Sequence, residues 1–283
     1  MPFTSTPLAH ESRPLLKLER VSKRHPNGTV ALHDLSLDVG DHDFIGLLGP
    51  PGCGKSTLLR LLAGLAPATS GKLTWYPQRT LGASRTDRER SFVFQQPALM
   101  AWSTVFDNVY LPLRLSGVQR DQADTTVSEA LAMLGLTRLR SAYPSGLALD
   151  VQMRVSIARA LVSQPRLLLM DEPFAALHEM ARTKLTDDLL AIWKEHRFTI
   201  VFTAHSVREA VQLCNRIVVM APSPVSVSVP VSGQGRAMQE LAINEPYPRQ
   251  AAEFPFSRRF NEHVQAAQRA LRTVQGGIAA AEH

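Results

Sequence analysis

The chain has few cysteines, few aromatic residues and no long apolar segment. Only two of its 283 residues are cysteines, Cys53 and Cys214, and they match no metal-ligand spacing, which favours a reducing compartment over a disulfide framework. Aromatic residues make up 6% of the chain, so aliphatic side chains must form most of the core. No apolar run approaches the ~18 residues that span a bilayer, and the first residues lack the apolar segment of a secretory signal. We therefore expect neither a membrane span nor a signal peptide.

Dense clusters of basic residues are also missing. The formal net charge is +6, but no run of lysine and arginine with interleaved aromatic residues occurs. Such runs accompany nucleic-acid binding, so we expect no nucleic-acid partner. A small positive excess is ordinarily solvated surface, and contact with a membrane face or an anionic nucleotide is the alternative. The hydrophobic share of 45% is ample for one large α/β domain, or for a core domain with a small insert and tail.

A glycine-rich stretch is the most informative feature that is present. Residues 49–57 read GPPGCGKST and fit the phosphate-binding P-loop pattern G-x-x-x-x-G-K-[ST]. Lys55 is expected to reach the β- and γ-phosphates of a nucleotide, and the Ser56 hydroxyl to ligate Mg²⁺. An apolar strand precedes the stretch and leucines at helical spacing follow it, which is the context that the motif demands. Cys53 is interpreted as a small filler and not as a nucleophile. The predicted nucleotide-binding residues are Gly49, Pro50, Pro51, Gly52, Cys53, Gly54, Lys55, Ser56 and Thr57.

The apolar pattern predicts a mostly parallel sheet preceded by antiparallel strands. Asn27-Gly28 is a hairpin signal between strands at 15–20 and 35–39. Continuous apolar runs are typical of strands buried on both faces of a parallel sheet. These runs lie at 44–48, 166–170, 198–202 and 216–220, and shorter strands are expected at 72–76 and 91–94, with an edge strand at 225–231.

Further helices are predicted along the chain, one of them marked by Leu185, Leu189, Ile192 and Trp193. From residue 97 to about residue 160 the apolar residues have helical spacing, and this stretch is interpreted as a helical insertion. Ser206 and Glu209 fit a capping box that begins another helix. Residues 232–258 are weakly patterned, and residues 260–271 form a last amphipathic helix.

Two carboxylates follow the apolar strand at 166–170. Asp171 is expected to hold Mg²⁺, directly or through water, and Glu172 to orient or deprotonate an attacking water. An apolar strand followed by Asp-Glu is by itself often an ordinary strand end. Downstream of a P-loop, the pair indicates nucleotide hydrolysis.

The order of these motifs resembles the ATP-binding subunits of ABC transporters, closest to the nitrate/sulfonate/taurine-type importers. The resemblance runs from about residue 15 to 271 and rests on GPPGCGKSTLLRLLAGLAPATSGKL, VFQQPALMAWSTVFDNV, RVSIARAL, LLLMDEPFAAL and TAHSVREAVQLCNRIVVM. It implies a P-loop ABC-ATPase fold of class α/β. The implied parts are an ATPase core over 15–94 and 161–231, a helical subdomain over 95–160 and a C-terminal extension over 232–283.

The resemblance also implies roles outside the P-loop. Gln95 matches the Q-loop glutamine, which contacts Mg²⁺ or water, and His205 matches the switch histidine, which hydrogen-bonds the γ-phosphate. His25 stands where the family has an aromatic residue that stacks on adenine, with a plain turn histidine as the alternative. Trp102 lies in the region that contacts membrane subunits, with core packing as the alternative. The implied catalytic residues are Glu172, His205 and Gln95, and the implied Mg²⁺ ligands are Ser56, Gln95 and Asp171.

Two motifs depart from the family pattern. The signature, usually Leu-Ser-Gly-Gly-Gln, reads Leu-Ala-Leu-Asp-Val at residues 147–151, so Ala148, Leu149 and Asp150 replace the serine and both glycines. His178 replaces the aspartate of the D-loop. In the family's head-to-tail dimer both motifs serve the partner's nucleotide. We therefore expect a heterodimer with a second ATPase subunit that has an intact signature, and a weak or inactive homodimer.

The implied function is ATP hydrolysis that powers import of a small solute, with ATP and Mg²⁺ as cofactors. Implied partners are transmembrane permease subunits and, indirectly, a periplasmic or extracellular solute-binding protein. The implied location is peripheral, at the cytoplasmic face of the inner membrane. One alternative is a nucleotide-binding structural or regulatory subunit with little turnover, and another is a P-loop kinase or an ABC ATPase without a transport role.

Overall fold

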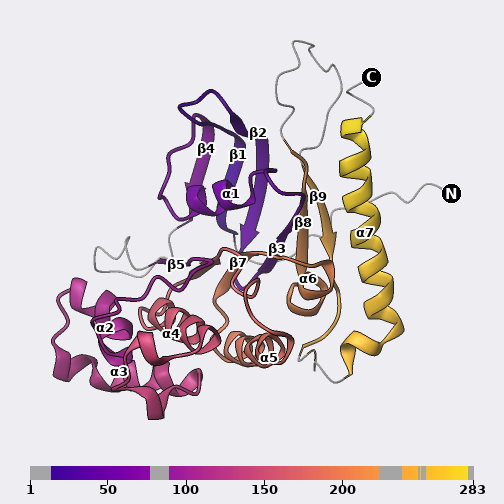
Figure 1. Cartoon of the computed structure of the whole chain (residues 1–283). Coiled ribbons are helices and arrows are strands. Elements are labelled where there is room, and N and C mark those ends of the chain that lie inside the picture. The colour runs from indigo at the N-terminus through magenta and orange to yellow at the C-terminus, as the bar shows by residue number, and fades with distance from the viewer. Residues whose placement is uncertain (1–13, 77–88, 223–237, 248, 250–252, 280–283) are drawn as a thin grey trace.

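Two β-sheets and a group of helices build the fold (Figure 1). The computed structural model describes residues 14–76, 89–222, 238–247, 249 and 253–279. The strands are β1 (Pro14–Arg24), β2 (Val30–Gly40), β3 (Phe44–Leu48), β4 (Ser70–Trp75), β5 (Arg90–Val93), β6 (Leu167–Met170), β7 (Thr199–Thr203), β8 (Arg216–Met220) and β9 (Met238–Ala242). The helices are α1 (Lys55–Leu62), α2 (Val105–Leu115), α3 (Arg120–Met133), α4 (Leu149–Leu161), α5 (Glu179–His196), α6 (Val207–Leu213) and α7 (Arg258–Ala279).

The smaller sheet is antiparallel and has the order β2-β1-β4. The turn between β1 and β2 contains the predicted Asn27-Gly28 pair. Gly28 adopts a positive φ of 87°, and the Asn27 side chain accepts a hydrogen bond from the backbone N–H of Thr29 at 3.1 Å. The predicted antiparallel pairing ahead of the P-loop is therefore confirmed.

The larger sheet has the order β5-β6-β7-β3-β8-β9. Its first five strands are parallel, and every residue of β3, β6 and β7 is buried, which explains their continuous apolar sequences. Because parallel strands end at the same edge of a sheet, the loops after β3, β5, β6 and β7 meet there. The predicted mostly parallel sheet is confirmed.

β9 was not predicted, because residues 232–258 have a weak apolar pattern. It pairs antiparallel with β8 at the edge of the larger sheet, and its Gln239 and Glu240 are exposed. An edge strand needs apolar side chains on one face only, and its partner supplies the backbone hydrogen bonds. Arg216 of β8 also forms an ion pair with Glu240 at 2.7 Å. The edge strand predicted at 225–231 lies outside the described residues.

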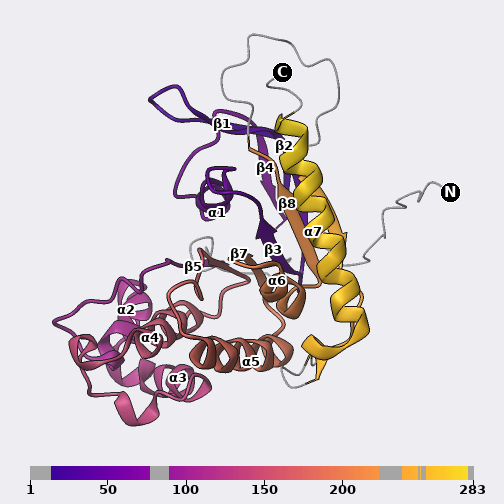
Figure 2. The same cartoon turned by 45° about the vertical axis from the view of Figure 1, so that its right-hand side comes forward.

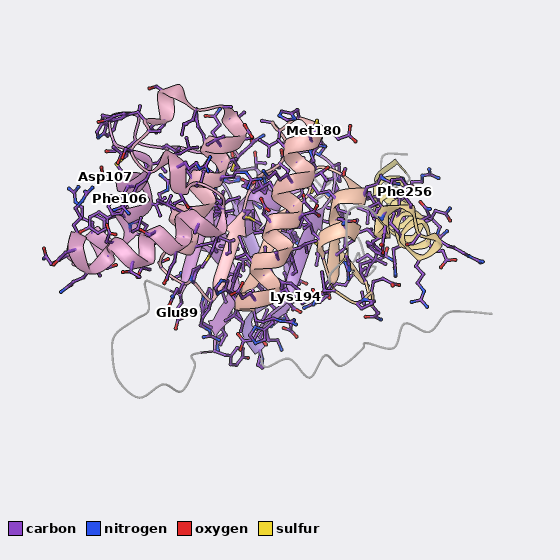
Figure 3. All side chains as sticks on the ribbon, turned by 90° about the horizontal axis from the view of Figure 1, so that it is seen from below. Glu89, Phe106, Asp107, Met180, Lys194 and Phe256 are labelled. Atoms are coloured by element: carbon purple, nitrogen blue, oxygen red, sulfur yellow. The ribbon has the colours of Figure 1, made fainter. Side chains whose placement is uncertain are left out.

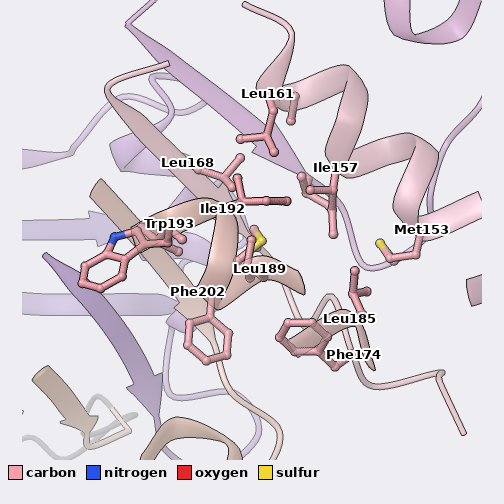
Figure 4. Close-up of a cluster of buried hydrophobic side chains, with 14 of the residues drawn as sticks. Met153, Ile157, Leu161, Leu168, Phe174, Leu185, Leu189, Ile192, Trp193 and Phe202 are labelled. Atoms are coloured by element: carbon pink, nitrogen blue, oxygen red, sulfur yellow. The ribbon is translucent and has the colours of Figure 1, made fainter. Parts of the chain in front are cut away.

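Apolar clusters cover both faces of the larger sheet. On one face the leucines of α1 pack between this sheet and the antiparallel sheet. On the other face α4 and α5 pack on β6 and β7, as Figure 4 shows for Met153, Ile157, Leu189 and Phe202. Figures 1 and 2 show α7 running beside β8 and β9 at the far edge. The predicted C-terminal amphipathic helix is thus present, with Phe260 fully buried.

The helices α2, α3 and α4 occupy the stretch predicted as a helical insertion and lie together at one side of the molecule (Figure 1). The ring of Phe106, labelled in Figure 3, contacts two guanidinium groups, that of Arg120 at 4.6 Å and that of Arg140 at 4.1 Å. Each arginine also forms an ion pair, with Asp107 and Asp124 respectively. In the described part of the chain, no helix has the length and apolarity needed to cross a bilayer.

Candidate functional site

The P-loop joins β3 to α1 and depends on close backbone approach. A side chain at Gly54 would lie 2.4 Å from the carbonyl oxygen of Ala31, and Gly54 has a positive φ of 96°. A side chain at Gly49 would lie 2.6 Å from the carbonyl oxygen of Met220. Gly54 is the N-cap of α1, and the first turn of α1 contains no acidic residue. The N-terminal N–H groups of α1 are therefore available to an anion.

Lys55 and Cys53 lie within this loop. The Lys55 ammonium donates hydrogen bonds to the carbonyl oxygens of Gly49 at 2.8 Å and Pro50 at 3.2 Å, so its charge is held over the loop. The Cys53 side chain is 1% exposed, and burial raises the pKa of its thiol despite the nearby Lys55. A raised pKa disfavours the nucleophilic thiolate. Cys53 therefore acts as a filler beneath the loop, as the sequence suggested.

Two hydroxyl groups converge on the carboxylate of Asp171, which follows β6. The Ser56 hydroxyl donates to Oδ1 of Asp171 at 3.0 Å, and the Thr203 hydroxyl donates to the same oxygen at 2.9 Å. Ser56 and Asp171 offer hard oxygen ligands of the kind that Mg²⁺ prefers, with other positions left for water and phosphate. Among the described residues no group of three or more His, Cys, Asp or Glu side chains could hold a metal. The Ser56–Asp171 pair fits a Mg²⁺ site of the other kind, in which water and phosphate supply most of the ligands.

Thr203 was not recognised from the sequence. It ends β7, next to β6, and its side chain is fully buried. Besides contacting Asp171, its Oγ1 accepts the backbone N–H of Glu172 at 2.6 Å. The available signal was a hydroxyl residue at the carboxyl end of an otherwise apolar strand. Thr203 thus links both carboxylate residues to the neighbouring strand.

Glu172 and Gln95 also lie together. Gln95 follows β5, and its Nε2 donates to Oε2 of Glu172 at 3.3 Å. Glu172 has a positive φ of 45°, which is uncommon outside glycine and marks a tightly constrained turn after β6. The structure therefore brings Gln95, Glu172, Asp171 and Ser56 to one edge of the sheet.

His205 lies after β7, at the same edge, and its side chain is exposed. Its backbone N–H donates to Oε2 of Glu209 at 3.0 Å, while the Ser206 hydroxyl accepts the N–H of Glu209 at 3.1 Å. The predicted capping box is therefore present, with the glutamate bonded one residue earlier than in the usual motif. Burial raises the pKa of Glu209, an effect that the His205 N–H only partly opposes.

His25 is placed apart from these contacts. It is half-buried in the turn between β1 and β2, where its backbone pairs with Thr29 and Gly28. Among the described residues, no hydrogen bond joins the ring of His25 or of His205 to Lys55 or the two carboxylates. The stacking role of His25 stays a prediction.

The altered signature forms the start of α4. Ala148 is the N-cap and makes no side-chain hydrogen bond, and Asp150 lies in the first turn. Leu149 is 42% exposed, although a leucine is ordinarily buried. Gln152 ties the preceding loop to the helix by donating to the carbonyl oxygens of Pro144 at 3.1 Å and Leu147 at 2.9 Å. The surface offered here is therefore apolar and acidic.

His178 and Trp102 are two further exposed positions that bear on the predicted partner contacts. His178 is the N-cap of α5, where its Nδ1 accepts the N–H of Ala181 at 3.3 Å, so the residue that replaces the D-loop aspartate still caps a helix. Trp102 is 80% exposed. Core packing, the alternative considered for Trp102, is therefore wrong, and contact with a membrane subunit stays a prediction.

Comparison with known proteins agrees with this geometry. The family described as ABC transporter matches residues 32–175. A taurine import ATP-binding protein of Roseobacter denitrificans is 40% identical over 213 residues, covering 74% of this chain and 78% of that protein. A bicarbonate transport ATP-binding protein of Synechocystis sp. is 36% identical over 228 residues, covering 78% of this chain and 79% of that protein.

A solved structure confirms the predicted ABC-ATPase fold. It is a dimeric ATP-binding cassette in a post-hydrolysis state with ADP and phosphate, with a TM-score of 0.64 and 29% identity over 72% of this chain and 94% of that one. A phosphate-binding loop, a paired serine and aspartate, and relatives that match along most of their length all agree. The chain therefore belongs to the ABC transporter family, among its ATP-binding proteins.

Proposed function

We propose that this chain binds and hydrolyses ATP to power an importer for a small solute. The observation that carries the proposal is the 3.0 Å contact between Ser56 and Asp171, with Glu172 and Gln95 beside it. Around a triphosphate in the P-loop, Lys55 binds the terminal phosphates, and Ser56 and Asp171 hold Mg²⁺, with Gln95 as a further ligand. When bound, Mg²⁺ neutralises charge that develops on the phosphates.

Hydrolysis then depends on three side chains around the terminal phosphate. Glu172 accepts the proton of the attacking water, Gln95 orients that water, and His205 donates a hydrogen bond to the phosphate. The hydrogen bond between Gln95 and Glu172 supports this assignment, since it places an amide and a carboxylate next to one another. His25 stacks on the adenine.

We further propose that the chain works beside a second, unlike ATPase subunit. The motifs that contact its own nucleotide, such as the P-loop, match the family pattern. The two motifs that would contact the partner's nucleotide, the signature and the D-loop, depart from it. Asp150 places a carboxylate where the partner's triphosphate would lie, and like charges ~4 Å apart repel by about 4 kcal/mol at an effective dielectric constant of ~20. The exposed Leu149 stands where the family has a glycine, whose backbone must approach phosphate closely. A partner with an intact signature would complete the site built on Gly49–Thr57.

The surroundings of the subunit follow from this assignment. Transmembrane permease subunits are direct partners, docking near the exposed Trp102, and a periplasmic or extracellular solute-binding protein is an indirect one. The location is peripheral, at the cytoplasmic face of the inner membrane. Relatives named for taurine import and for bicarbonate transport have similar sequence identity to this chain. Their names support a small anionic or zwitterionic solute, such as a sulfonate or nitrate.

Glu172→Gln, made in the transporter that contains this chain, tests the proposal. The variant keeps the shape of the side chain and removes the base, so we expect ATP binding to persist and ATP-dependent uptake to stop. A subunit with a structural or regulatory role and little turnover, which the altered signature would otherwise suggest, would give unchanged uptake. Exposed Glu195→Gln is the matched control and should leave uptake as it is.

A further inference from the structure

Arg249, in the segment between β9 and α7, is a charged side chain that is 2% exposed. One terminal nitrogen donates to the carbonyl oxygens of Val211 at 3.0 Å and Cys214 at 2.6 Å. The other donates to the carbonyl oxygens of Ile243 at 2.9 Å and Glu245 at 3.1 Å. The guanidinium therefore joins the last turn of α6 to the C-terminal extension through backbone atoms on both sides.

Neighbouring residues strengthen the same connection. The Tyr247 hydroxyl donates to the carbonyl oxygen of Leu213 at 2.7 Å, and the Gln212 side chain donates to the carbonyl oxygen of Arg249 at 2.8 Å. The aromatic ring of Tyr247 lies 4.2 Å from the Arg249 guanidinium. The carbonyl groups at the end of a helix have no partner within it. The extension supplies partners to three of them, at Val211, Leu213 and Cys214.

A second contact lies near the start of α6. The Arg208 guanidinium stacks on the ring of Phe260 at 4.7 Å and donates to the carbonyl oxygen of Pro255 at 3.3 Å. Phe260 is fully buried. Figures 1 and 2 show α6 beside the lower part of α7, and Figure 3 places Phe256 next to α7 as well. The extension thus contacts α6 at both of its ends.

The length of α6 makes these contacts important. It has seven residues, whereas isolated helices shorter than about 12 residues are marginal in water. Its position must therefore come from packing. The helix begins at Val207, immediately after His205 and Ser206, and the Glu209 carboxylate accepts the backbone N–H of His205. A displacement of α6 would therefore displace His205.

We propose that Arg249 is a positioning residue for His205, acting through α6. The C-terminal extension fixes the last turn of α6, the capping box transmits that position to the turn after β7, and His205 is held at the edge of the sheet that carries the P-loop. This inference rests on the proposed function, which assigns His205 to the terminal phosphate. The extension would thus affect catalysis indirectly, through α6 and without contacting the nucleotide.

Hydrogen–deuterium exchange of the full chain tests this inference. In Arg249→Met we expect amides from His205 to Leu213 to exchange about tenfold faster, since their local opening becomes easier. Tyr247→Phe removes one hydrogen bond and should act in the same direction more weakly, which keeps the test available if Arg249→Met does not fold. Arg258→Met, on the same extension but exposed, is the control. Exchange in α1 should not change in any variant.

Nucleotide affinity and turnover provide the second measurement. In the assembled transporter, Tyr247→Phe and Arg249→Met should lower kcat with little change in KM for ATP, because among the described residues no hydrogen bond joins the P-loop to α6. Faster exchange confined to Ile243–Tyr247, with His205 to Leu213 unchanged, would overturn the inference. If His205→Ala hydrolyses ATP normally while exchange changes as expected, the proposed role of His205 fails but the anchoring of α6 stands.

Discussion

The hydroxyl of Thr203 lies 2.9 Å from Oδ1 of Asp171 and joins the end of β7 to the carboxylate after β6. The same hydroxyl oxygen of Thr203 accepts the backbone N–H of Glu172. Thr203→Val keeps the shape of the side chain but removes both hydrogen bonds. Partners that orient metal ligands typically contribute 10–100-fold to metal affinity, so we expect the Mg²⁺ concentration for half-maximal ATP binding to rise by about that factor. A Mg²⁺ titration of ATP binding measures this.

Thr203→Ser is the matched control, because it retains the hydroxyl. It should stay within about threefold of wild type in the same titration. Equal Mg²⁺ dependence in the valine variant and wild type would show that Thr203 has only a packing role.

Arg159 connects α4 to the loop that carries Gln95. Its terminal nitrogens donate to the carbonyl oxygens of Ala98 and Pro97, each at 2.9 Å. Since the altered signature begins the same helix, α4 links that motif to Gln95. In Arg159→Met we expect the residue 95–98 loop to be cleaved faster by limited proteolysis and turnover in the transporter to fall about tenfold. Exposed Arg138→Met should change neither, and an unchanged loop in Arg159→Met would contradict this link.

The sequence predicted those parts of the site whose geometry is determined by a few consecutive residues. The P-loop, the two carboxylates after β6 and the capping box at Ser206 each occupy a short stretch whose residues specify the local geometry. Buried parallel strands have continuous apolar sequences, so the larger sheet could also be predicted. Together these local signals are enough to place Lys55, Asp171 and His205 at one edge of the sheet.

Contacts between distant segments could not be predicted in this way. Thr203 contacts Asp171 only because β6 and β7 are neighbours, and that order is a property of the sheet. In the sequence, nothing distinguishes Arg249 from the other basic residues of a polar stretch. In the structure it is buried and donates hydrogen bonds to backbone carbonyl groups. β9 lacks a strong apolar pattern, so only its pairing with β8 identifies it as a strand. Each case depends on a partner that is remote in sequence.

Glu209 should make thermal stability depend on pH. Burial raises its pKa in the folded chain above the ordinary value of 4.5. A carboxyl group whose pKa is higher in the folded chain than in the unfolded chain stabilises the fold at pH below its unfolded pKa. This stabilisation is lost as the pH rises through the folded pKa. Glu209→Gln is neutral at every pH and keeps an oxygen that accepts the N–H of His205. We therefore expect a higher Tm than wild type at pH 8 and a smaller difference at pH 4.5, measured by calorimetry.

Exposed Glu129→Gln, on α3, is the control for the general effect of removing a charge. It should show no comparable change in the Tm difference between the two pH values. A lower Tm for Glu209→Gln at pH 8 would show instead that the ionised carboxylate stabilises the capping box.

Restoring the signature should convert this chain into an active homodimer. In Ala148→Ser/Leu149→Gly/Asp150→Gly the serine can cap α4, which is worth ~1 kcal/mol, and the glycines let backbone N–H groups approach a phosphate. In other enzymes, removing one hydrogen-bond donor to a developing negative charge lowers turnover about 100–1,000-fold. We therefore expect ATP hydrolysis at least about 100-fold faster than in wild type. Ala148→Ser alone keeps Asp150 and should gain little.

A mixing experiment separates the two halves of the composite site. The triple variant with the added change Lys55→Ala has an intact signature and a disabled P-loop, and wild type has the reverse. In the proposed head-to-tail dimer each site takes its P-loop from one subunit and its signature from the other, so either protein alone should hydrolyse ATP slowly, whereas their mixture should form one complete site. Coupled-assay rates across mixing ratios should peak near equimolar protein. Ordinary transporter rates from wild type alone, or no gain on mixing, would mean that the altered signature does not determine how these subunits pair.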